Sequence, residues 1–334
     1  MARRQILPIF IPHLGCPNDC VFCNQRRISG SLVPSEARDV TRLLQRACDN
    51  GIKNAELAYY GGSFTATLPE TQESLLGAAQ PYLENGTIAA IRLSTRPDAV
   101  DAAVIERLHR FGVNTVELGT QSMDDAVLYE SGRGHTAADT ENAFRLLRDA
   151  GFSVILQMMT GLPGADVSSD IRTAQKIIAL HPDGVRIYPT VIIKDTPLED
   201  LWRAGMYKEH TVHDAVRVCA DILPMMRAAG IPVIRLGLNP TGDLSGGDAI
   251  GGAYHPALGE LVRSEIMLRQ ARDLLQHMEL KPGSEVVLTV ASKQLSTMIG
   301  QHRRNVQMLT EEFALKRLKI LSGDVPEDEI LVYI

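Results

Sequence analysis

The chain has 334 residues with 45% hydrophobic and 22% charged side chains, a composition of folded globular proteins that excludes a disordered or low-complexity chain. A formal net charge of −6 gives no overall attraction to nucleic acid, although it leaves room for a local basic surface. No apolar run approaches the roughly 18 residues of a membrane span. The five cysteines are an odd number and three lie within eight residues, which argues against a disulfide framework. We therefore expect a cytoplasmic protein with no membrane partner.

Short β-rich runs alternate with helical stretches along most of the chain. The predicted strands cover residues 6–12, 55–60, 88–94, 113–118, 153–159, 185–189 and 232–236. The predicted helices cover residues 35–49, 70–83, 99–111, 137–150, 168–180 and 212–229. Because each parallel crossover needs a helix, repeated βα units predict a parallel sheet. We expect an α/β fold with a partial or full TIM-like (βα) barrel, and an open doubly wound sheet is the alternative.

The alternation stops at residues 237–256, where glycines and prolines predict a long irregular loop of the kind that is often functional. A long helix is expected over residues 258–277, and Lys281-Pro282-Gly283 is typical of a linker. Beyond it we expect a strand, two helices and a second strand, at residues 285–290, 292–299, 303–313 and 315–321. The sequence thus predicts a barrel with an extension over residues 1–280 and a small α/β domain over residues 281–334.

Three cysteines form a CxxxCxxC pattern directly after the first predicted strand, at Cys16, Cys20 and Cys23. Three thiolates can hold three irons of a four-iron cube and leave the fourth iron open for a small ligand. The carboxyl end of a barrel strand is also where active sites lie. The alternative is a structural zinc site with His13 as fourth ligand, but such sites usually combine two separated ligand pairs. Isolated Cys48 and Cys219 are expected to be core residues.

With this cysteine loop and an aromatic residue, Phe22, before the third cysteine, the chain resembles the radical S-adenosylmethionine superfamily from about residue 6 to residue 280. The resemblance implies a 4Fe–4S cluster whose open iron binds the methionine end of S-adenosylmethionine. It also implies formation of a 5′-deoxyadenosyl radical that removes a hydrogen atom from the substrate. The cofactors carry this chemistry, while the protein positions and shields them.

The resemblance further implies that S-adenosylmethionine is bound at the ends of successive strands. Gly61, Gly62 and Ser63 match the glycine motif whose backbone meets the methionine amino group. Ser94 stands where a polar residue usually lies near the ribose. Gln121 and Arg133 have the twelve-residue separation seen in the related anaerobic coproporphyrinogen dehydrogenases.

Arg133 suits the cofactor carboxylate as a charge-assisted donor, and a role in a helix-capping loop is the alternative. By the same resemblance Gln157 is expected near the ribose. Backbone groups around Ile192 are expected near the adenine, although this run also reads as an ordinary buried strand.

Several segments resemble the Elongator-type branch, whose catalytic subunit modifies wobble uridines in tRNA. They are residues 133–136, 191–198, 201–208 and 252–257. The resemblance makes Lys194, Lys208, Tyr254 and His255 candidates for the substrate site. For His255, a loop histidine that caps the following helix is an equal alternative. No acetyltransferase-like region follows the barrel in this sequence, so we do not expect acetyl transfer to carry over.

Residues 298–306 loosely resemble the GxxG turn of a KH domain, with Arg303 in place of the second glycine. Residues 293–319 hold six Lys or Arg against two Glu, which fits an RNA-facing surface or, equally, a solvated helix face. We therefore expect a radical enzyme acting on tRNA or rRNA, with a reductase, flavodoxin or ferredoxin as electron donor. Oxidation of a tetrapyrrole or other small molecule is one alternative. A non-catalytic RNA-binding or iron–sulfur carrier protein is the other.

Overall fold

The computed structural model describes residues 4–11, 16, 20–24, 35–238 and 244–334. The chain divides into two compact units. The barrel unit comprises Met1–Thr211 and Ile222–Tyr254, and the C-terminal unit comprises Val212–Asp221 and His255–Ile334. The helix that we expected over residues 258–277, at the end of the barrel region, thus belongs to the C-terminal unit.

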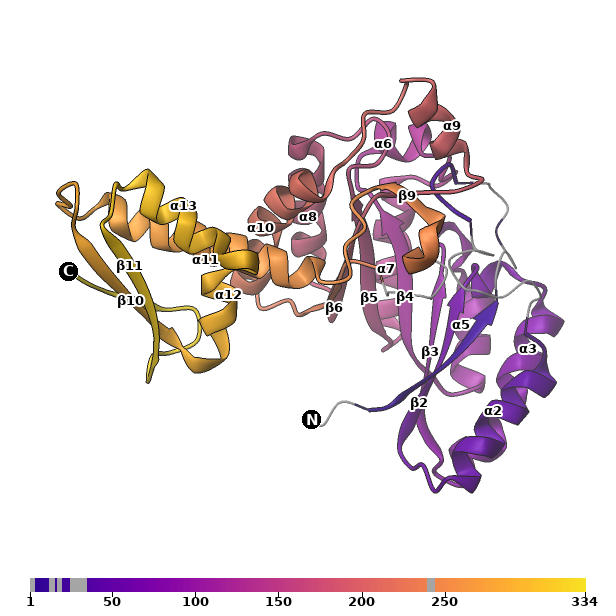
Figure 1. The fold of residues 1–334 in the computed structure, drawn as a ribbon. Helices are drawn as coiled ribbons and strands as arrows, with labels where there is room; N and C mark the ends of the chain where they lie inside the picture. The colour runs from indigo at the N-terminus through magenta and orange to yellow at the C-terminus, as the bar shows by residue number, and fades with distance from the viewer. Residues whose placement is uncertain (1–3, 12–15, 17–19, 25–34, 239–243) are drawn as a thin grey trace. The chain divides into compact units, whose positions relative to one another are not determined.

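The barrel unit is built on a seven-stranded sheet in which every neighbouring pair is parallel. The strands, in their order across the sheet, are β1 (Ile6–Ile11), β2 (Ala55–Gly61), β3 (Ile88–Thr95), β4 (Val113–Gln121), β5 (Ser153–Thr160), β6 (Gly184–Pro189) and β8 (Val233–Leu236). This order follows the chain without a reversal, whereas a doubly wound sheet reverses direction at a switch point. The partial barrel is therefore confirmed, and the open doubly wound alternative is wrong. Figure 1 shows the curved sheet with helices on its outer side.

The barrel helices mostly follow the predicted ranges. They are α2 (Ala37–Asp49), α3 (Pro69–Gly77), α4 (Gln80–Glu84), α5 (Ala102–Arg110), α6 (Asp125–Glu130), α7 (Ala137–Asp149), α8 (Val167–Leu180), α9 (Pro197–Arg203) and α10 (Val212–Ala228). The helix predicted over residues 70–83 is two helices. Pro81 explains the break, because its ring cannot donate a backbone hydrogen bond and so fits only the first turn of the second helix. Thr136 and Asp166 start α7 and α8 with capping boxes.

The central strands are largely buried on both faces, as expected for a parallel sheet covered by helices, and they include a few buried charged residues. Short 3-10 turns lie at η1 (Phe64–Ala66) and η2 (Pro97–Ala99). The region predicted as an irregular loop contains structure in its described part. A π-helical turn, η3 (Leu244–Asp248), precedes β9 (Ala249–Gly252), which pairs antiparallel with β7 (Val191–Ile193). Gly252 permits this pairing, because a Cβ there would lie 2.7 Å from the carbonyl oxygen of Thr190.

The C-terminal unit packs helices on one face of a three-stranded sheet (Figure 1). Its elements are α11 (Leu258–Gln276), β10 (Glu285–Ala291), η4 (Ser292–Gln294), α12 (Leu295–Ile299), η5 (Gln301–Arg303), α13 (Arg304–Glu312), β11 (Arg317–Gly323) and β12 (Ile330–Tyr333). β10 is central, parallel to β11 and antiparallel to β12, a strand that the sequence analysis missed. Met267 and Leu275 of α11 share an apolar core with Val286 and Leu288 of β10, which explains why α11 belongs here. None of the helices in the described ranges is both long and apolar enough to cross a membrane.

Candidate active site

A cavity of about 320 Å³ lies at the carboxyl ends of the barrel strands. This is the edge at which (βα) barrels place their active sites. The predicted cluster and cofactor residues that line it are Cys16, Cys20, Phe22, Cys23, Gly61, Gly62, Ser63, Ser94, Gln121, Arg133 and Gln157. Residues that are far apart in the sequence therefore surround one space, although what each contacts in a bound ligand stays a prediction.

The cysteine loop is attached to the barrel through Val21 and Phe22. The backbone N–H of Val21 donates to the carbonyl oxygen of Ser131 at 3.1 Å, and its own carbonyl accepts from the N–H of Leu198 at 2.8 Å. The Phe22 ring packs against the apolar clusters that contain Met159 and Leu198. This packing gives Phe22 a physical role, because it anchors the chain between Cys20 and Cys23.

Cys16, Cys20 and Cys23 form no disulfide with any described residue, and they line the same cavity. Among the described residues, no three His, Cys, Asp or Glu side chains stand in a metal-binding arrangement. His13, the fourth ligand of the zinc alternative, lies outside the described residues. Three thiols that come from one short loop and face one cavity fit a cluster that keeps one open iron.

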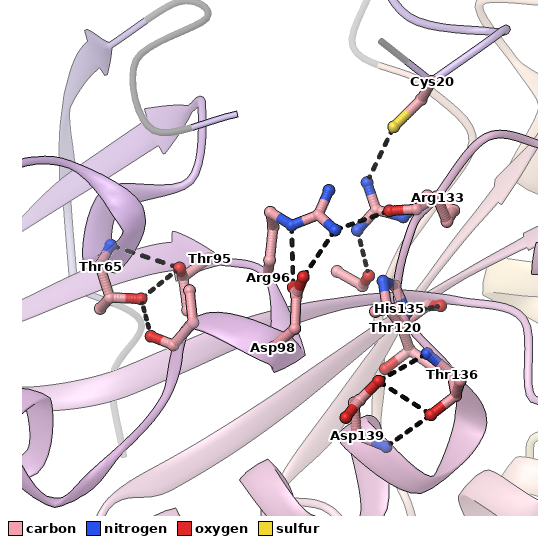
Figure 2. A network of polar contacts seen from close by, with 12 residues as sticks. Cys20, Thr65, Thr95, Arg96, Asp98, Thr120, Arg133, His135, Thr136 and Asp139 are labelled. Atoms are coloured by element: carbon pink, nitrogen blue, oxygen red, sulfur yellow. Dashed lines mark hydrogen bonds and ion pairs between the residues drawn. The ribbon is translucent and has the colours of Figure 1, made fainter. Parts of the chain in front are cut away.

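Arg133 reaches the cysteine loop from the segment between α6 and α7. Its Nη1 donates to Cys20 Sγ at 3.2 Å, and its Nη2 donates to the carbonyl oxygen of Gly119 at 2.7 Å (Figure 2). A Cβ at Gly119 would lie 2.9 Å from Gln121 Nε2 and 3.2 Å from Arg133 Nη2, so a larger residue there would displace both side chains. The hydrogen bond from Nη1 fixes the position of the Cys20 sulfur beside the guanidinium.

Arg96 lies beside Arg133 and was missed by the sequence analysis (Figure 2). It is only 2% exposed; its Nε and Nη2 donate to Asp98 at 2.8 and 2.9 Å, and Nη2 also donates to the carbonyl oxygen of Arg133 at 2.6 Å. Its Nη1 has no hydrogen-bond partner within the described part of the chain. Leaving a buried charged donor unpaired is costly, so this atom is suited to an acceptor on a ligand. The signal available in the sequence was an arginine directly after a buried strand.

His135 is buried behind these arginines and stays neutral. Its Nε2 lies 3.2 Å from the carbonyl oxygen of Thr120. Burial, with a further contribution from Arg133, lowers the pKa of His135 to about 4. Thr136 and Asp139, also shown in Figure 2, form the capping box that starts α7 directly after it. The 133–136 segment therefore combines a cavity-lining arginine with a helix start.

The two glutamines of the cavity are joined by a hydrogen bond from Gln157 Nε2 to Gln121 Oε1 at 3.2 Å. Gln121 has a φ of 62°, a left-handed backbone that non-glycine residues adopt mainly where the surroundings enforce it. Gly61 has a φ of 104°, which a residue with a side chain adopts only with strain. Gly61 ends β2 and Gln121 ends β4, so both lie at the carboxyl ends of strands that line the cavity.

A buried network of ion pairs crosses the barrel below these residues. Glu117 binds both Arg92, at 2.7 Å, and Arg186, at 2.8 Å, and Arg92 also pairs with Glu56 at 2.9 Å. Glu117 is 3% exposed and lines the cavity together with Arg186. The sequence analysis missed this network, although charged residues within otherwise apolar strands were a signal for it.

The residues that line the cavity do not include the four predicted substrate residues, which are Lys194, Lys208, Tyr254 and His255. Lys194 and Lys208 are exposed. The Tyr254 hydroxyl lies 2.8 Å from Ser245 Oγ. The Nδ1 of His255 accepts the N–H of Ala257, the residue directly before α11. Ile192 is buried, whereas its neighbours Val191 and Ile193 line the cavity, as the alternation of a strand requires.

Comparison with known protein families identifies the chain. Residues 10–177 match the model of the Radical SAM superfamily, and residues 182–267 match the Radical SAM C-terminal domain. The protein belongs to the radical SAM superfamily. It is therefore an enzyme of the kind that uses a 4Fe–4S cluster and S-adenosylmethionine, and the cavity places its cysteines and its cofactor motifs together.

The relatives are of the Elongator type. The chain is 29% identical over 197 residues to human Elongator complex protein 3, covering 53% of this chain and 36% of that protein. It is 32% identical over 183 residues to the tRNA uridine(34) acetyltransferase of Methanocaldococcus jannaschii, covering 49% of this chain and 34% of that protein. The matched region thus spans about a third of these relatives. In fold, the chain is similar to Elp3 of Methanocaldococcus infernus, with a TM-score of 0.63 at 23% identity over 80% of this chain and 63% of that one.

Proposed function

We propose that this radical SAM enzyme modifies a uridine base in tRNA. The observation that carries the proposal is the similarity of about half of the chain to an enzyme named for its action on tRNA uridine(34). The similarity covers only part of that relative, so the substrate base is carried over here and the transferred group is not.

The chain's own residues supply three things to this chemistry. Cys16, Cys20 and Cys23 would hold the cluster, and Arg133 would donate to the sulfur of Cys20 as it does in the structure. The open Nη1 of Arg96 and the neighbouring Arg133 guanidinium are the donors suited to the carboxylate of S-adenosylmethionine. When bound, the cluster and cofactor supply a 5′-deoxyadenosyl radical able to remove a hydrogen atom from the base.

The apolar wall of the cavity supports radical chemistry. Phe22, Met159, Val191, Ile193 and Leu244 line one part of it. Side chains of this kind keep water away from a reactive species and limit its side reactions. The polar lining includes the cofactor motifs at the strand ends and the Glu117–Arg186 pair within β4 and β6.

The C-terminal unit supports an RNA substrate through a smaller basic surface than the sequence indicated. Lys293 pairs with Glu327, Lys316 with Glu285, and Arg304 with Glu265, so half of the six basic residues have acidic partners. The other half, for which the described residues provide no ion pair, are Arg303, Arg317 and Lys319.

These three side chains lie on a turn and on one strand face. Arg303 has a φ of 63° in the turn before α13. Arg317 and Lys319 are two positions apart on β11 and so lie on the same face. Phosphate contacts of such residues would hold an RNA without reading its sequence.

The proposal is tested with anaerobically reconstituted enzyme, a chemical reductant in place of the unknown electron donor, S-adenosylmethionine and unmodified tRNA transcripts. Nucleoside mass spectrometry of the digested tRNA should show a uridine derivative that is absent without S-adenosylmethionine. Recovery of unchanged uridine, with turnover of a tetrapyrrole or another small molecule instead, would reject the tRNA proposal in favour of the small-molecule one.

A further inference from the structure

Two tyrosines in the cavity, Tyr60 on β2 and Tyr188 on β6, share one arginine. Arg186 donates from Nη2 to the Tyr60 oxygen at 3.2 Å and from Nη1 to the Tyr188 oxygen at 3.3 Å. Its Cζ also lies 5.6 Å from the centre of the Tyr60 ring. All three residues line the same cavity as the cysteines.

The direction of these two hydrogen bonds is fixed by chemistry. A guanidinium carries only donors, so both phenol oxygens must accept from Arg186. Each phenol hydrogen therefore points elsewhere. No other hydrogen-bond partner of either hydroxyl occurs among residues 4–11, 16, 20–24, 35–238 and 244–334.

Arg186 is itself held in place. Glu117 pairs with its Nε at 2.8 Å and also accepts from its Nη2 at 3.0 Å. Arg92 binds the same carboxylate from the other side, so the two arginines are balanced by Glu117 and Glu56. Burying four charges costs desolvation energy that apolar side chains would avoid. Burial, followed by the charge of Glu117, raises the pKa of Tyr60 to about 12, so its hydroxyl keeps its hydrogen at neutral pH.

Given the tRNA-uridine function proposed above, on which this inference rests, we propose that the Tyr60 and Tyr188 hydroxyls donate hydrogen bonds to the carbonyl oxygens of the uracil base. Uracil offers two carbonyl acceptors, whereas cytosine replaces one of them by an amino donor. The cytosine amino group would face a tyrosine hydroxyl that already accepts from Arg186 and has its hydrogen left to donate. Two donors would then face each other, and their hydrogen bonds would stay unmade. The pair is thus a specificity device that accepts uracil and disfavours cytosine.

The experiment measures binding rather than turnover. Cluster-loaded enzyme with S-adenosylmethionine is titrated with two synthetic anticodon stem-loops that differ only in carrying uridine or cytidine at position 34. This is the position on which the archaeal relative is named to act. The wild-type enzyme should bind the uridine RNA about tenfold more tightly. The double variant Tyr60→Phe, Tyr188→Phe should reduce this ratio to near one while its affinity for S-adenosylmethionine is unchanged. Tyr129→Phe is the matched control, because that tyrosine is 87% exposed.

A second arm needs no protein variant and so does not depend on folding. Replacing a uracil carbonyl oxygen by sulfur, a weaker acceptor, should lower the affinity of wild-type enzyme for the stem-loop. An unchanged uridine-to-cytidine ratio in the double variant, together with normal RNA binding, overturns the inference and leaves the proposed function standing. A loss of S-adenosylmethionine affinity with an unchanged ratio also overturns it, since the tyrosines would then serve the cofactor. If the wild-type enzyme binds neither RNA, the proposed function fails and the inference fails with it.

Discussion

The barrel unit buries charged side chains, whereas the C-terminal unit keeps its charges at the surface. Arg96, Glu117 and Arg186 are 2%, 3% and 9% exposed in the barrel unit. In residues 255–334, by contrast, the buried polar side chains are the uncharged Ser264 and Asn305, and the core is apolar. A buried ion pair is weak evidence for stability, because desolvation offsets much of the attraction. We therefore propose that the barrel's buried charges are held for ligands rather than for stability, and that a ligand of the C-terminal unit would meet its surface.

The largest expected effect concerns the cysteine loop of the barrel. Replacing Cys16, Cys20 or Cys23 by Ala should abolish a content of about four iron and four sulfide per chain after anaerobic reconstitution. Cys48→Ala is the matched control, because this cysteine lies on α2, apart from the loop, and should leave the iron content unchanged. Stoichiometric zinc in place of iron after anaerobic isolation would contradict the cluster assignment.

A second prediction uses Asp170, a buried carboxyl group of the barrel unit whose oxygen accepts the N–H of Gly161 at 3.0 Å. Burial raises the pKa of Asp170 from 3.8 to about 7. The folded state therefore holds this proton more tightly than the unfolded state does. The stability that the group contributes is complete below pH 3.8 and is lost as the pH rises through about 7.

Asp170→Asn keeps an acceptor for Gly161 and removes the titration. Between about pH 5 and pH 8 the wild type should lose on the order of 2–3 kcal/mol of unfolding free energy relative to this variant. Urea unfolding at both pH values measures the difference. Parallel curves for the two proteins would show that Asp170 is not buried as a neutral acid.

The third prediction concerns Arg133. Arg133→Ala should weaken S-adenosylmethionine binding by roughly ten- to a hundredfold, because a hydrogen bond to a charged group contributes about 1.5–3 kcal/mol. Calorimetric titration with S-adenosylmethionine measures the affinity. Arg145 is an exposed arginine of α7, so the control variant Arg145→Ala should bind the cofactor as tightly as the wild type. Unchanged affinity in Arg133→Ala would restrict this residue to supporting Cys20.

Features that arise from a local sequence pattern could be predicted from the sequence, whereas features that arise from contacts between distant segments could not. All seven barrel strands follow from their apolar runs, and the cysteine loop and glycine motif follow from spacing. The roles of Arg96, Arg186 and Tyr60 do not, because they depend on which side chains meet across different strands. β12 was missed for a related reason, since its residues follow an acidic turn and alternate between half-buried and exposed.

The smallest expected effect tests the surface charges of the C-terminal unit. The double change Arg303→Glu, Lys319→Glu should weaken RNA binding and flatten its salt dependence, by about 0.7 in the log–log slope for each single-strand phosphate that the variant no longer binds. The cluster spectrum should stay the same. The double variant Arg38→Glu, Arg42→Glu is the control, because it changes the net charge by the same amount at exposed positions of α2. Equally weakened binding in both double variants would mean that net charge, rather than these side chains, attracts RNA.

The most direct test of the account is the formation of 5′-deoxyadenosine by the anaerobically reconstituted enzyme. Reactions contain S-adenosylmethionine and reductant, with unmodified tRNA transcript, an equal mass of ribosomal RNA, or no RNA. A radical enzyme that acts on tRNA should form 5′-deoxyadenosine faster with the tRNA than in either other reaction, and the Cys20→Ala variant should form none. Equal rates in all three reactions of the wild-type enzyme would contradict the claim that tRNA is the substrate.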